Sequence, residues 1–363
     1  MFEERIERVR ARMNELGIDA LLLSVGADLP WLTGYQAMAS ERLTMLVLPV
    51  DADATMVVPE LEAPRVEARA ELFTLRPWTE TDDPIELVAS LIGGRAQLAI
   101  SDRTWATFVL ALQSAQPAAV WQPTSLVTAP LRAVKDAAEI AALRRAAHAA
   151  DSVATELLKG DIPLIGHTEA EVSAEISARL RAAGHDSVSF AIVASGPNAA
   201  SPHHTPGDRR IGAGESVVCD FGGPVGGYCS DITRTVFTGA PDARARDVYS
   251  TVQAAQAAAV DAATVGMPAE DVDGVARRII TEAGYGDYFI HRTGHGIGLE
   301  GHEPPYLVGG NCEALVGGNA FSIEPGIYLP GNLGVRIEDI VVASDAGPEA
   351  LNVADHDLAV VEA

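Results

Sequence analysis

The sequence predicts an α/β domain over residues 1–130, followed by an α+β domain over residues 131–363. In the first part, short apolar runs alternate with helical segments, which is typical of a layered α/β domain. In the second part, glycine-rich turns separate strand-like runs, and long helices interrupt them. The length of 363 residues agrees with two domains of ordinary size.

Strands and helices alternate in the predicted N-terminal domain. Apolar residues at a helical spacing predict a helix over 4–16. Short apolar runs predict buried strands, with a turn at 50–53 between the second and the third; they cover 20–25, 45–49, 54–58 and 97–100. A further helix is expected from about residue 103. Pro117, Pro123 and Pro130 then indicate a domain boundary within residues 122–136.

Long helices and short strands define the second domain. An alanine-rich helix is expected from Asp136 to about Leu158. Thr168 followed by Glu171 forms a capping-box pattern that predicts a helix over 168–183. The remaining expected helices cover 243–262 and 270–284, and the expected strands, in an antiparallel sheet, cover 216–219, 235–237 and 339–342.

The charge balance and the apolar pattern exclude several classes of protein. Lys and Arg number 26 against 50 Asp and Glu, a formal net charge of −24. Sequence-independent nucleic-acid binding and attachment to anionic membranes both need clustered positive charge. No apolar run approaches the roughly 20 residues of a membrane span, and the first residues lack a signal-peptide core. Three sparse cysteines make no disulfide framework, so we expect a cytoplasmic protein.

Chemistry-bearing residues recur at strand edges of the second domain. Asp220 ends an apolar run, and Asp231 follows a glycine-rich hairpin. His295 lies between two glycines, which permit close backbone approach and positive φ in a loop around a site. Glu324 and Glu338 each stand at the edge of an apolar strand. A charge placed there is costly unless it is paired or bound to metal.

Taken singly, each of these acidic residues is expected to be an ordinary turn or surface residue. Together, four carboxylates and one imidazole suit divalent Mn, Co, Fe or Zn. Such a set is too large for one structural zinc. It suits two metals about 3.5–4 Å apart that share bridging carboxylates.

On these residues, the chain resembles the M24-type metallopeptidases with the pita-bread fold, which include methionine aminopeptidase, aminopeptidase P and prolidase. Residues 31–35 and the linker over 131–140 resemble the creatinase/prolidase N-terminal domain and its exit. The resemblance implies an N-terminal domain of that type before a pita-bread catalytic domain. It also implies two divalent metal ions, with Mn²⁺ or Co²⁺ favoured and Zn²⁺ or Fe²⁺ as alternatives.

The resemblance assigns roles residue by residue. The implied metal ligands are Asp220, Asp231, His295, Glu324 and Glu338. Asp231 and Glu338 bridge the metals in such enzymes, Asp220 holds one metal, and His295 with Glu324 holds the other. Glu324 is also the implied general base for a metal-bridging hydroxide.

Further residues match the branch that cleaves before proline. His203 matches a proton-relay and substrate-pocket histidine, and His302 matches one at the scissile bond. His291 matches a residue of the pocket beyond the cut, and Arg336 matches an arginine of the polar network. Tyr306 stands where some prolidases carry an arginine that meets the dipeptide carboxylate, and the resemblance assigns it to substrate binding together with His291 and Arg336.

Several functions remain open at this stage. An Xaa-Pro dipeptidase (prolidase) is favoured, and an aminopeptidase P that acts on longer peptides is the main alternative. Methionine aminopeptidase needs no N-terminal domain of about 130 residues, and the metal-free creatinase lacks this ligand set. A non-enzymatic binding scaffold would be expected to lose ligands. A homodimer is expected by resemblance, and Thr233 is either a partner of a metal ligand or a plain strand residue.

Overall fold

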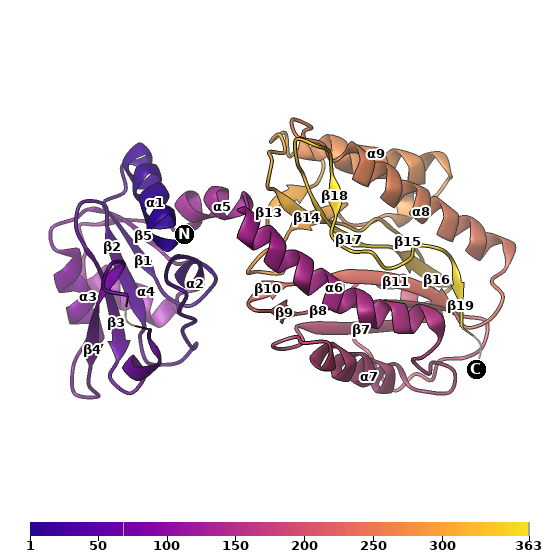
Figure 1. Cartoon of the computed structure of the whole chain (residues 1–363), viewed down its shortest axis with the longest axis horizontal. Helices are drawn as coiled ribbons and strands as arrows, with labels where there is room; N and C mark the ends of the chain where they lie inside the picture. Colours follow the sequence, from indigo (N-terminus) through magenta and orange to yellow (C-terminus); the bar gives the residue numbers. More distant parts are fainter. Residues whose placement is uncertain (68, 362–363) are drawn as a thin grey trace. The chain divides into compact units, whose positions relative to one another are not determined.

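The computed structural model describes residues 1–67 and 69–361, and it divides into two compact units, Met1–Arg132 and Ala133–Ala363 (Figure 1). The first unit is built on a six-stranded sheet of order β4-β3-β2-β1-β5-β6. Strand β1 pairs in parallel with β5 and antiparallel with β2. The mixed sheet and its helices confirm the α/β class of the N-terminal domain.

The four predicted strands and the two predicted helices of the first unit are confirmed, and the sequence left several other elements unpredicted. The strands are β1 (Ala20–Leu23), β2 (Met45–Pro49), β3 (Ala54–Pro59), β4 (Phe73–Trp78), β5 (Gln97–Ile100) and β6 (Val120–Pro123). The helices are α1 (Phe2–Leu16), α2 (Asp28–Thr33), α3 (Pro84–Ile92), α4 (Ala106–Ala115) and α5 (Ser125–Ala133). Helix α4 begins three residues later than expected because Ser101–Thr104 forms a turn.

Helix α5 occupies the segment in which the prolines predicted a boundary. Pro130 lies inside it, although proline disfavours a helix interior. The helix is fastened by the buried carboxylate of Asp28, which accepts hydrogen bonds from Thr124, Thr128 and Arg132. These tertiary contacts outweigh the local signal of the proline.

The second unit contains two larger sheets, each covered by a pair of long helices, and two two-stranded sheets, β10-β9 and β15-β16. The sheet of order β19-β11-β8-β7 packs against α6 (Ala137–Lys159) and α7 (Glu169–Ala182) around one apolar core. The sheet of order β13-β12-β14-β17-β18 contributes to a second core with α8 (Ala243–Ala262) and α9 (Ala269–Glu282). Figure 1 shows α8 and α9 running side by side. This arrangement confirms the α+β, pita-bread class.

Local signals set the ends of these helices. Asp136 and Glu139 form a capping box at the start of α6, and Gly160 ends it in the left-handed conformation. Thr168 and Glu171 form the predicted capping box of α7. Each box satisfies two backbone N–H groups that the first turn leaves without partners.

The strands of the second unit are short, and nearly all pair antiparallel; β19 joins β11 in parallel. Those of the first sheet and of the predicted hairpin are β7 (Phe190–Ser195), β8 (Ser216–Gly222), β9 (Pro224–Val225), β10 (Tyr228–Cys229), β11 (Ile232–Phe237) and β19 (Ala359–Val360). The others are β12 (Gly294–Gly296), β13 (Glu303–Leu307), β14 (Ala320–Ile323), β15 (Gly326–Leu329), β16 (Leu333–Arg336), β17 (Asp339–Val342) and β18 (Glu349–Ala350).

Buried Arg234 ties the two sheets together. Its side chain is fully buried on β11 and donates to the carbonyl oxygen of Glu338 at 2.7 Å and to Asp339 Oδ1 at 2.8 Å. It also donates to the carbonyl oxygens of Ala354 and Asp355. The guanidinium group therefore fixes the start of β17 and the C-terminal segment on β11. No helix within the described ranges is both long and apolar enough to cross a membrane.

Replacing Arg234 is expected to destabilise the protein strongly. Arg234→Met leaves the buried carboxylate of Asp339 and several carbonyl oxygens without their donor, so the free energy of unfolding should fall by about 3–5 kcal/mol. Arg144→Met is the matched control, because Arg144 pairs with Glu349 at the surface and should cost less than about 1 kcal/mol. Urea unfolding of both variants measures the difference; equal losses would contradict this role.

Candidate metal centre

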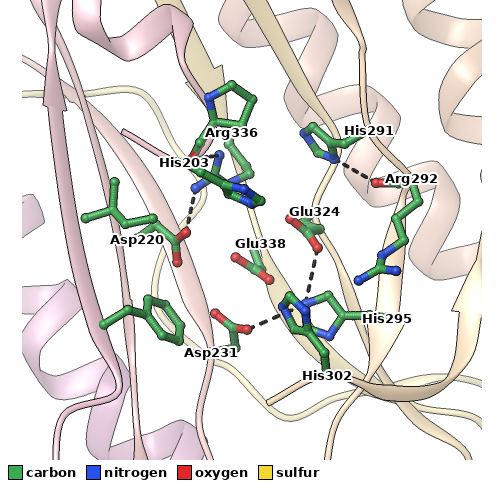
Figure 2. A pocket seen from close by; sticks show the side chains of 13 residues that line it. His203, Asp220, Asp231, His291, Arg292, His295, His302, Glu324, Arg336 and Glu338 are labelled. Atoms are coloured by element: carbon green, nitrogen blue, oxygen red, sulfur yellow. Dashed lines mark hydrogen bonds and ion pairs between the residues drawn. The ribbon is translucent and has the colours of Figure 1, made fainter. Parts of the chain in front are cut away.

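The five predicted ligands converge on one cavity of the second unit. Figure 2 shows their side chains pointing toward a common centre. The cavity encloses about 470 Å³ and is lined by Phe190, Ile192, Pro202, His203, Asp220, Asp231, His291, Arg292, His295, His302, Glu324, Arg336 and Glu338. Of the residues predicted for the site, Tyr306 is absent from this lining.

Each ligand sits on or beside a strand. Asp220 lies within β8, and Asp231 directly precedes β11, which pairs with β8. Glu324 directly follows β14, and Glu338 directly precedes β17, which pairs with β14. Two neighbouring strands in each sheet thus bring residues distant in sequence to one place.

The glycines beside His295 allow its strand to pack closely. A Cβ at Gly294 would lie 1.8 Å from the Ser322 carbonyl oxygen, and one at Gly296 would lie 2.3 Å from the Pro304 carbonyl oxygen. Neither glycine has positive φ, and together with His295 they form β12. The expected close approach is confirmed, whereas the expected bent loop is wrong at these three residues because they pair with β13 and β14.

The imidazole of His295 presents a lone pair to the carboxylates. Its Nδ1 lies 3.1 Å from the Gly296 carbonyl oxygen and must donate to it, so Nε2 carries no proton in the neutral ring. Nε2 lies 3.3 Å from Glu324 Oε1 and 3.7 Å from Asp231 Oδ2. Burial lowers the pKa of His295 to about 3, so the ring is neutral near pH 7.

Three carboxylates of the site resist ionisation in this environment. Burial, reinforced by the neighbouring carboxylates, raises the pKa values of Asp231 and Glu338 well above their ordinary values. Burial also raises the pKa of Glu324 to about 7, against the opposing charge of Arg336. Clustered buried carboxylates repel one another unless a proton or a cation lies among them.

These observations fit a bound metal. Ligand atoms of Asp231, His295 and Glu338 lie within 4.8 Å of one another. The facing atoms of His295, Glu324 and Asp231 are all acceptors, so a shared cation would satisfy them. Asp220 Oδ1 is buried and has no hydrogen-bond partner among the described residues. The donor set of oxygen atoms with one imidazole nitrogen suits a divalent metal of borderline hardness.

Arg336 and Thr233 hold the carboxylates in place. Arg336 donates to Asp220 Oδ2 at 2.6 Å and to Thr233 Oγ1 at 3.0 Å. Thr233 in turn donates to Glu338 Oε2 at 2.6 Å. Thr233 is therefore the partner of a predicted metal ligand and not a plain strand residue. Such contacts orient metal ligands and tune their basicity.

His291 lines the cavity with both ring nitrogens engaged. Nδ1 donates to the Arg292 carbonyl oxygen at 2.7 Å, so Nε2 accepts from the Tyr328 hydroxyl at 2.8 Å. Tyr328 also accepts from Arg336 at 2.9 Å. Burial lowers the pKa of His291 to about 4, with a smaller contribution from Arg336. The neutral ring thus offers mainly its carbon edge to a bound molecule.

His203 and His302 lie exposed at the cavity. The ring of His302 lies 3.9 Å from that of His295 between centroids. His203 follows the short 3₁₀ helix over Gly196–Ala200. Both imidazoles are therefore open to a molecule that enters the cavity.

A buried carboxylate anchors the segment that carries His203. Glu169 accepts hydrogen bonds from the Ser195 backbone and hydroxyl groups, from Asn198, and from His204 at 2.7 Å. Burial raises the pKa of Glu169, but these hydrogen bonds together lower it below its ordinary value. His204 thus helps to fix the position of its neighbour. Sequence reasoning missed this cluster because its members stand in three separate segments.

Arg292 and Tyr328 were also missed by sequence reasoning. Arg292 lines the cavity, and its Cζ lies 4.4 Å from the centroid of the Tyr306 ring. Arg292 stands next to His291 in the printed sequence, but adjacency alone says nothing of where its side chain points. Tyr328 lies in an apolar run that indicates only a buried strand.

Comparisons with known proteins agree with this geometry. Residues 141–345 match metallopeptidase family M24, and residues 5–134 match the creatinase/prolidase N-terminal domain. The probable dipeptidase PepE of Mycobacterium tuberculosis is 43% identical over 366 residues, 99% of this chain and 97% of that protein. The structure of a prolidase from Thermococcus sibiricus superposes with a TM-score of 0.92 at 38% identity, covering 99% and 98%. An X-Pro aminopeptidase from Thermotoga maritima reaches 0.84 at 30% identity, covering 96% and 100%.

The chain therefore belongs to metallopeptidase family M24 and carries a creatinase-type N-terminal domain. It is a metallopeptidase, as the sequence predicted.

Metal binding is expected to release protons near neutral pH. A carboxyl group whose pKa is raised in the folded protein keeps its proton at pH values where the unfolded chain has lost it. The contribution of Glu324 to the stability of the metal-free protein is therefore lost as the pH rises from about 4 through its pKa near 7. Metals need the ionised form, so their affinity should rise with pH over the same range. Calorimetric titration with Mn²⁺ in buffers of different ionisation enthalpy measures the released protons.

Glu324→Gln provides the comparison for this titration. It removes one group that titrates near pH 7, so fewer protons should be released. Binding heats that are independent of the buffer in the wild-type protein would contradict the proposed protonation of the site.

Proposed function

We propose that this protein hydrolyses the peptide bond before proline in Xaa-Pro dipeptides, with two divalent metal ions. The observation that carries the proposal is the position of His295 Nε2, which lies 3.3 Å from Glu324 Oε1 and 3.7 Å from Asp231 Oδ2. The 470 Å³ cavity beside them has room for a small peptide. The similarity to a prolidase and to a probable dipeptidase supports the substrate class.

The proposed metal ligands divide into three groups. Asp231 and Glu338 would be shared between two ions, Asp220 would complete one site, and His295 with Glu324 would complete the other. Two divalent cations would polarise the scissile carbonyl group and make a shared water acidic enough to attack near pH 7. Mn²⁺ and Co²⁺ are the favoured ions, and Zn²⁺ and Fe²⁺ also suit this set of ligands.

Glu324 is the proposed general base. Its carboxylate lines the cavity 3.3 Å from His295 Nε2, beside the proposed metal sites, where it could accept a proton and return it. The Ser322 hydroxyl lies 3.2 Å from Glu324 Oε1 and orients it. The residue would take the proton from the attacking water and deliver it to the nitrogen that leaves.

His302 and His203 are proposed to act on the substrate. An imidazole N–H of His302 would stabilise the negative charge that develops on the carbonyl oxygen. His203 would bind the substrate or relay a proton to the leaving amine. His291 would contribute an apolar surface for the proline ring, because its nitrogens are already hydrogen-bonded within the protein.

A proline substrate suits such a cavity. The bond before proline has no N–H group, and the ring restricts the residue that precedes it. Recognition through extended backbone hydrogen bonds is therefore weakened, and a cavity shaped for a rigid ring replaces it. A homodimer in solution is part of the proposal and is measured by light scattering.

An aminopeptidase P activity on longer peptides is the second candidate. Tyr306, in place of the arginine of some prolidases, favours it, as does the similarity to an X-Pro aminopeptidase. Hydrolysis of Ala-Pro and Ala-Pro-Ala by metal-stripped protein reloaded with Mn²⁺ or Co²⁺ distinguishes the two. We expect preference for Ala-Pro; preference for the tripeptide would assign the second activity. Failure on both substrates in a folded, metal-loaded protein would favour a binding scaffold.

Glu324→Gln is expected to abolish nearly all turnover while the fold is retained. The amide cannot accept a proton and is a poorer metal ligand. The kcat for Ala-Pro, with circular dichroism to confirm folding, tests this expectation. Wild-type turnover in the variant would remove Glu324 from the reaction.

Asp231→Asn and His203→Ala should have different effects on metal content. Asp231→Asn should lower bound metal below two ions per chain, because the amide bridges cations poorly. His203→Ala should lower kcat by about 10²–10⁴-fold with metal content unchanged. Metal analysis of both purified variants provides the measurement. Loss of metal from His203→Ala would contradict the division between ligands and substrate-contacting residues.

A further inference from the structure

The Arg292 side chain lines the cavity and stacks on an aromatic ring. Figure 2 shows it extending beside Glu324 and His295. Across residues 1–67 and 69–361, no hydrogen bond or ion pair engages its guanidinium group. Its Cζ instead lies 4.4 Å from the centroid of the Tyr306 ring. Stacking on this ring holds the cation at the wall of the cavity.

Arg292 differs from Arg336, the other arginine of the cavity, in its hydrogen bonds. Arg336 lines the same cavity and donates to Asp220, Thr233 and Tyr328. Arg292 pairs with none of the four nearby carboxylates. A stacked guanidinium group keeps the N–H groups at its edge available, and its planar fork matches the two oxygens of a carboxylate.

We propose that Arg292 binds the α-carboxylate of the residue after the cleaved bond and thereby selects dipeptides. The inference rests on the proposed Xaa-Pro hydrolysis and refines its substrate class. Tyr306 replaces the arginine of some prolidases, but its ring supports Arg292. His295 on β12 pairs with Tyr306 on β13. Arg292, two residues before β12, can therefore place its guanidinium group over the Tyr306 ring.

This assignment changes the meaning of Tyr306. The absence of an arginine there favours longer substrates only if no other cation reaches the same region. In a dipeptide the carboxylate directly follows the proline ring, whereas a longer peptide has an uncharged amide at that point. A cation at this place therefore favours the free acid over the amide.

The substrate could supply a carboxylate from two sources, and the test separates them. One is the α-carboxylate, and the other is an acidic side chain of the residue before proline. Ala-Pro, Ala-Pro-amide and Glu-Pro-amide distinguish them, because the second lacks both carboxylates and the third has only the side-chain one. We measure kcat/KM for each with Mn²⁺-loaded wild-type protein, Arg292→Met and Arg292→Lys.

The expected result is a loss of selectivity rather than of catalysis alone. In Arg292→Met, the ratio of kcat/KM for Ala-Pro to that for Ala-Pro-amide should fall about 10- to 100-fold, the effect of one charge-assisted contact. Arg292→Lys should keep part of the ratio, since it retains the charge and loses the fork. Calorimetry should show weaker binding of proline, and unchanged binding of prolinamide, in Arg292→Met.

A compensating variant and a surface control sharpen the test. Adding Tyr306→Arg to Arg292→Met should restore much of the selectivity, because it returns a cation to the same region. Arg144→Met changes an exposed arginine of the surface pair with Glu349 and should leave the ratio unchanged. If Arg292 had only a structural role, adding Tyr306→Arg would not restore the selectivity for the free acid.

The other possible outcomes would refute either the carboxylate contact of Arg292 or the proposed Xaa-Pro hydrolysis. An unchanged ratio in Arg292→Met, or equal losses on acid and amide, would refute the carboxylate contact while Xaa-Pro hydrolysis stands. A selective loss on Glu-Pro-amide would assign Arg292 to the side chain before proline and would also refute it. Failure of the wild-type protein on all three substrates would instead refute the proposed function.

Discussion

The burial of four carboxylates beside one neutral imidazole is the constraint on which this structure depends. Asp231 and Glu338 are nearly inaccessible to solvent, and burial with mutual repulsion raises their pKa values. Burying charge of one sign is costly unless a counter-charge compensates it. Arg336 supplies one positive charge within the protein. Divalent cations would supply the rest, so binding of metal and stability of the folded site are linked.

Strand β11 and the glycines of β12 hold the buried carboxylates in place. The Thr233 hydroxyl joins Arg336 to Glu338, while Arg234, the next residue on β11, binds the Glu338 carbonyl oxygen. Thr233 and Arg234 are consecutive residues of β11, so their side chains face opposite sides of the strand. Thr233 faces the carboxylates, and Arg234 faces the core. Gly294 and Gly296 bring β12 against its neighbours so closely that any side chain would clash. Side chains on or beside paired strands are positioned more precisely than side chains on loops, which suits carboxylates that are proposed to share cations.

Much of the fold and the set of converging residues could be predicted from the sequence. Apolar periodicity and capping boxes, such as Thr168 with Glu171, act locally and are legible in a single chain. Helix α5 was not predicted, because the contacts that stabilise it despite Pro130 come from Asp28, about a hundred residues away. The stacking of Arg292 on Tyr306 and the cluster around Glu169 likewise depend on side-chain directions that only the folded chain defines.

We propose that Asp220, Asp231, His295, Glu324 and Glu338 hold two metal ions, with Asp231 and Glu338 shared between them. Anomalous diffraction at the manganese edge, from crystals of the Mn²⁺-loaded protein, tests it most directly. We expect two anomalous peaks in the cavity, both in contact with Asp231 and Glu338. One peak should also contact Asp220, and the other should contact His295 and Glu324. A single peak, or two peaks that do not share Asp231 and Glu338, would contradict it.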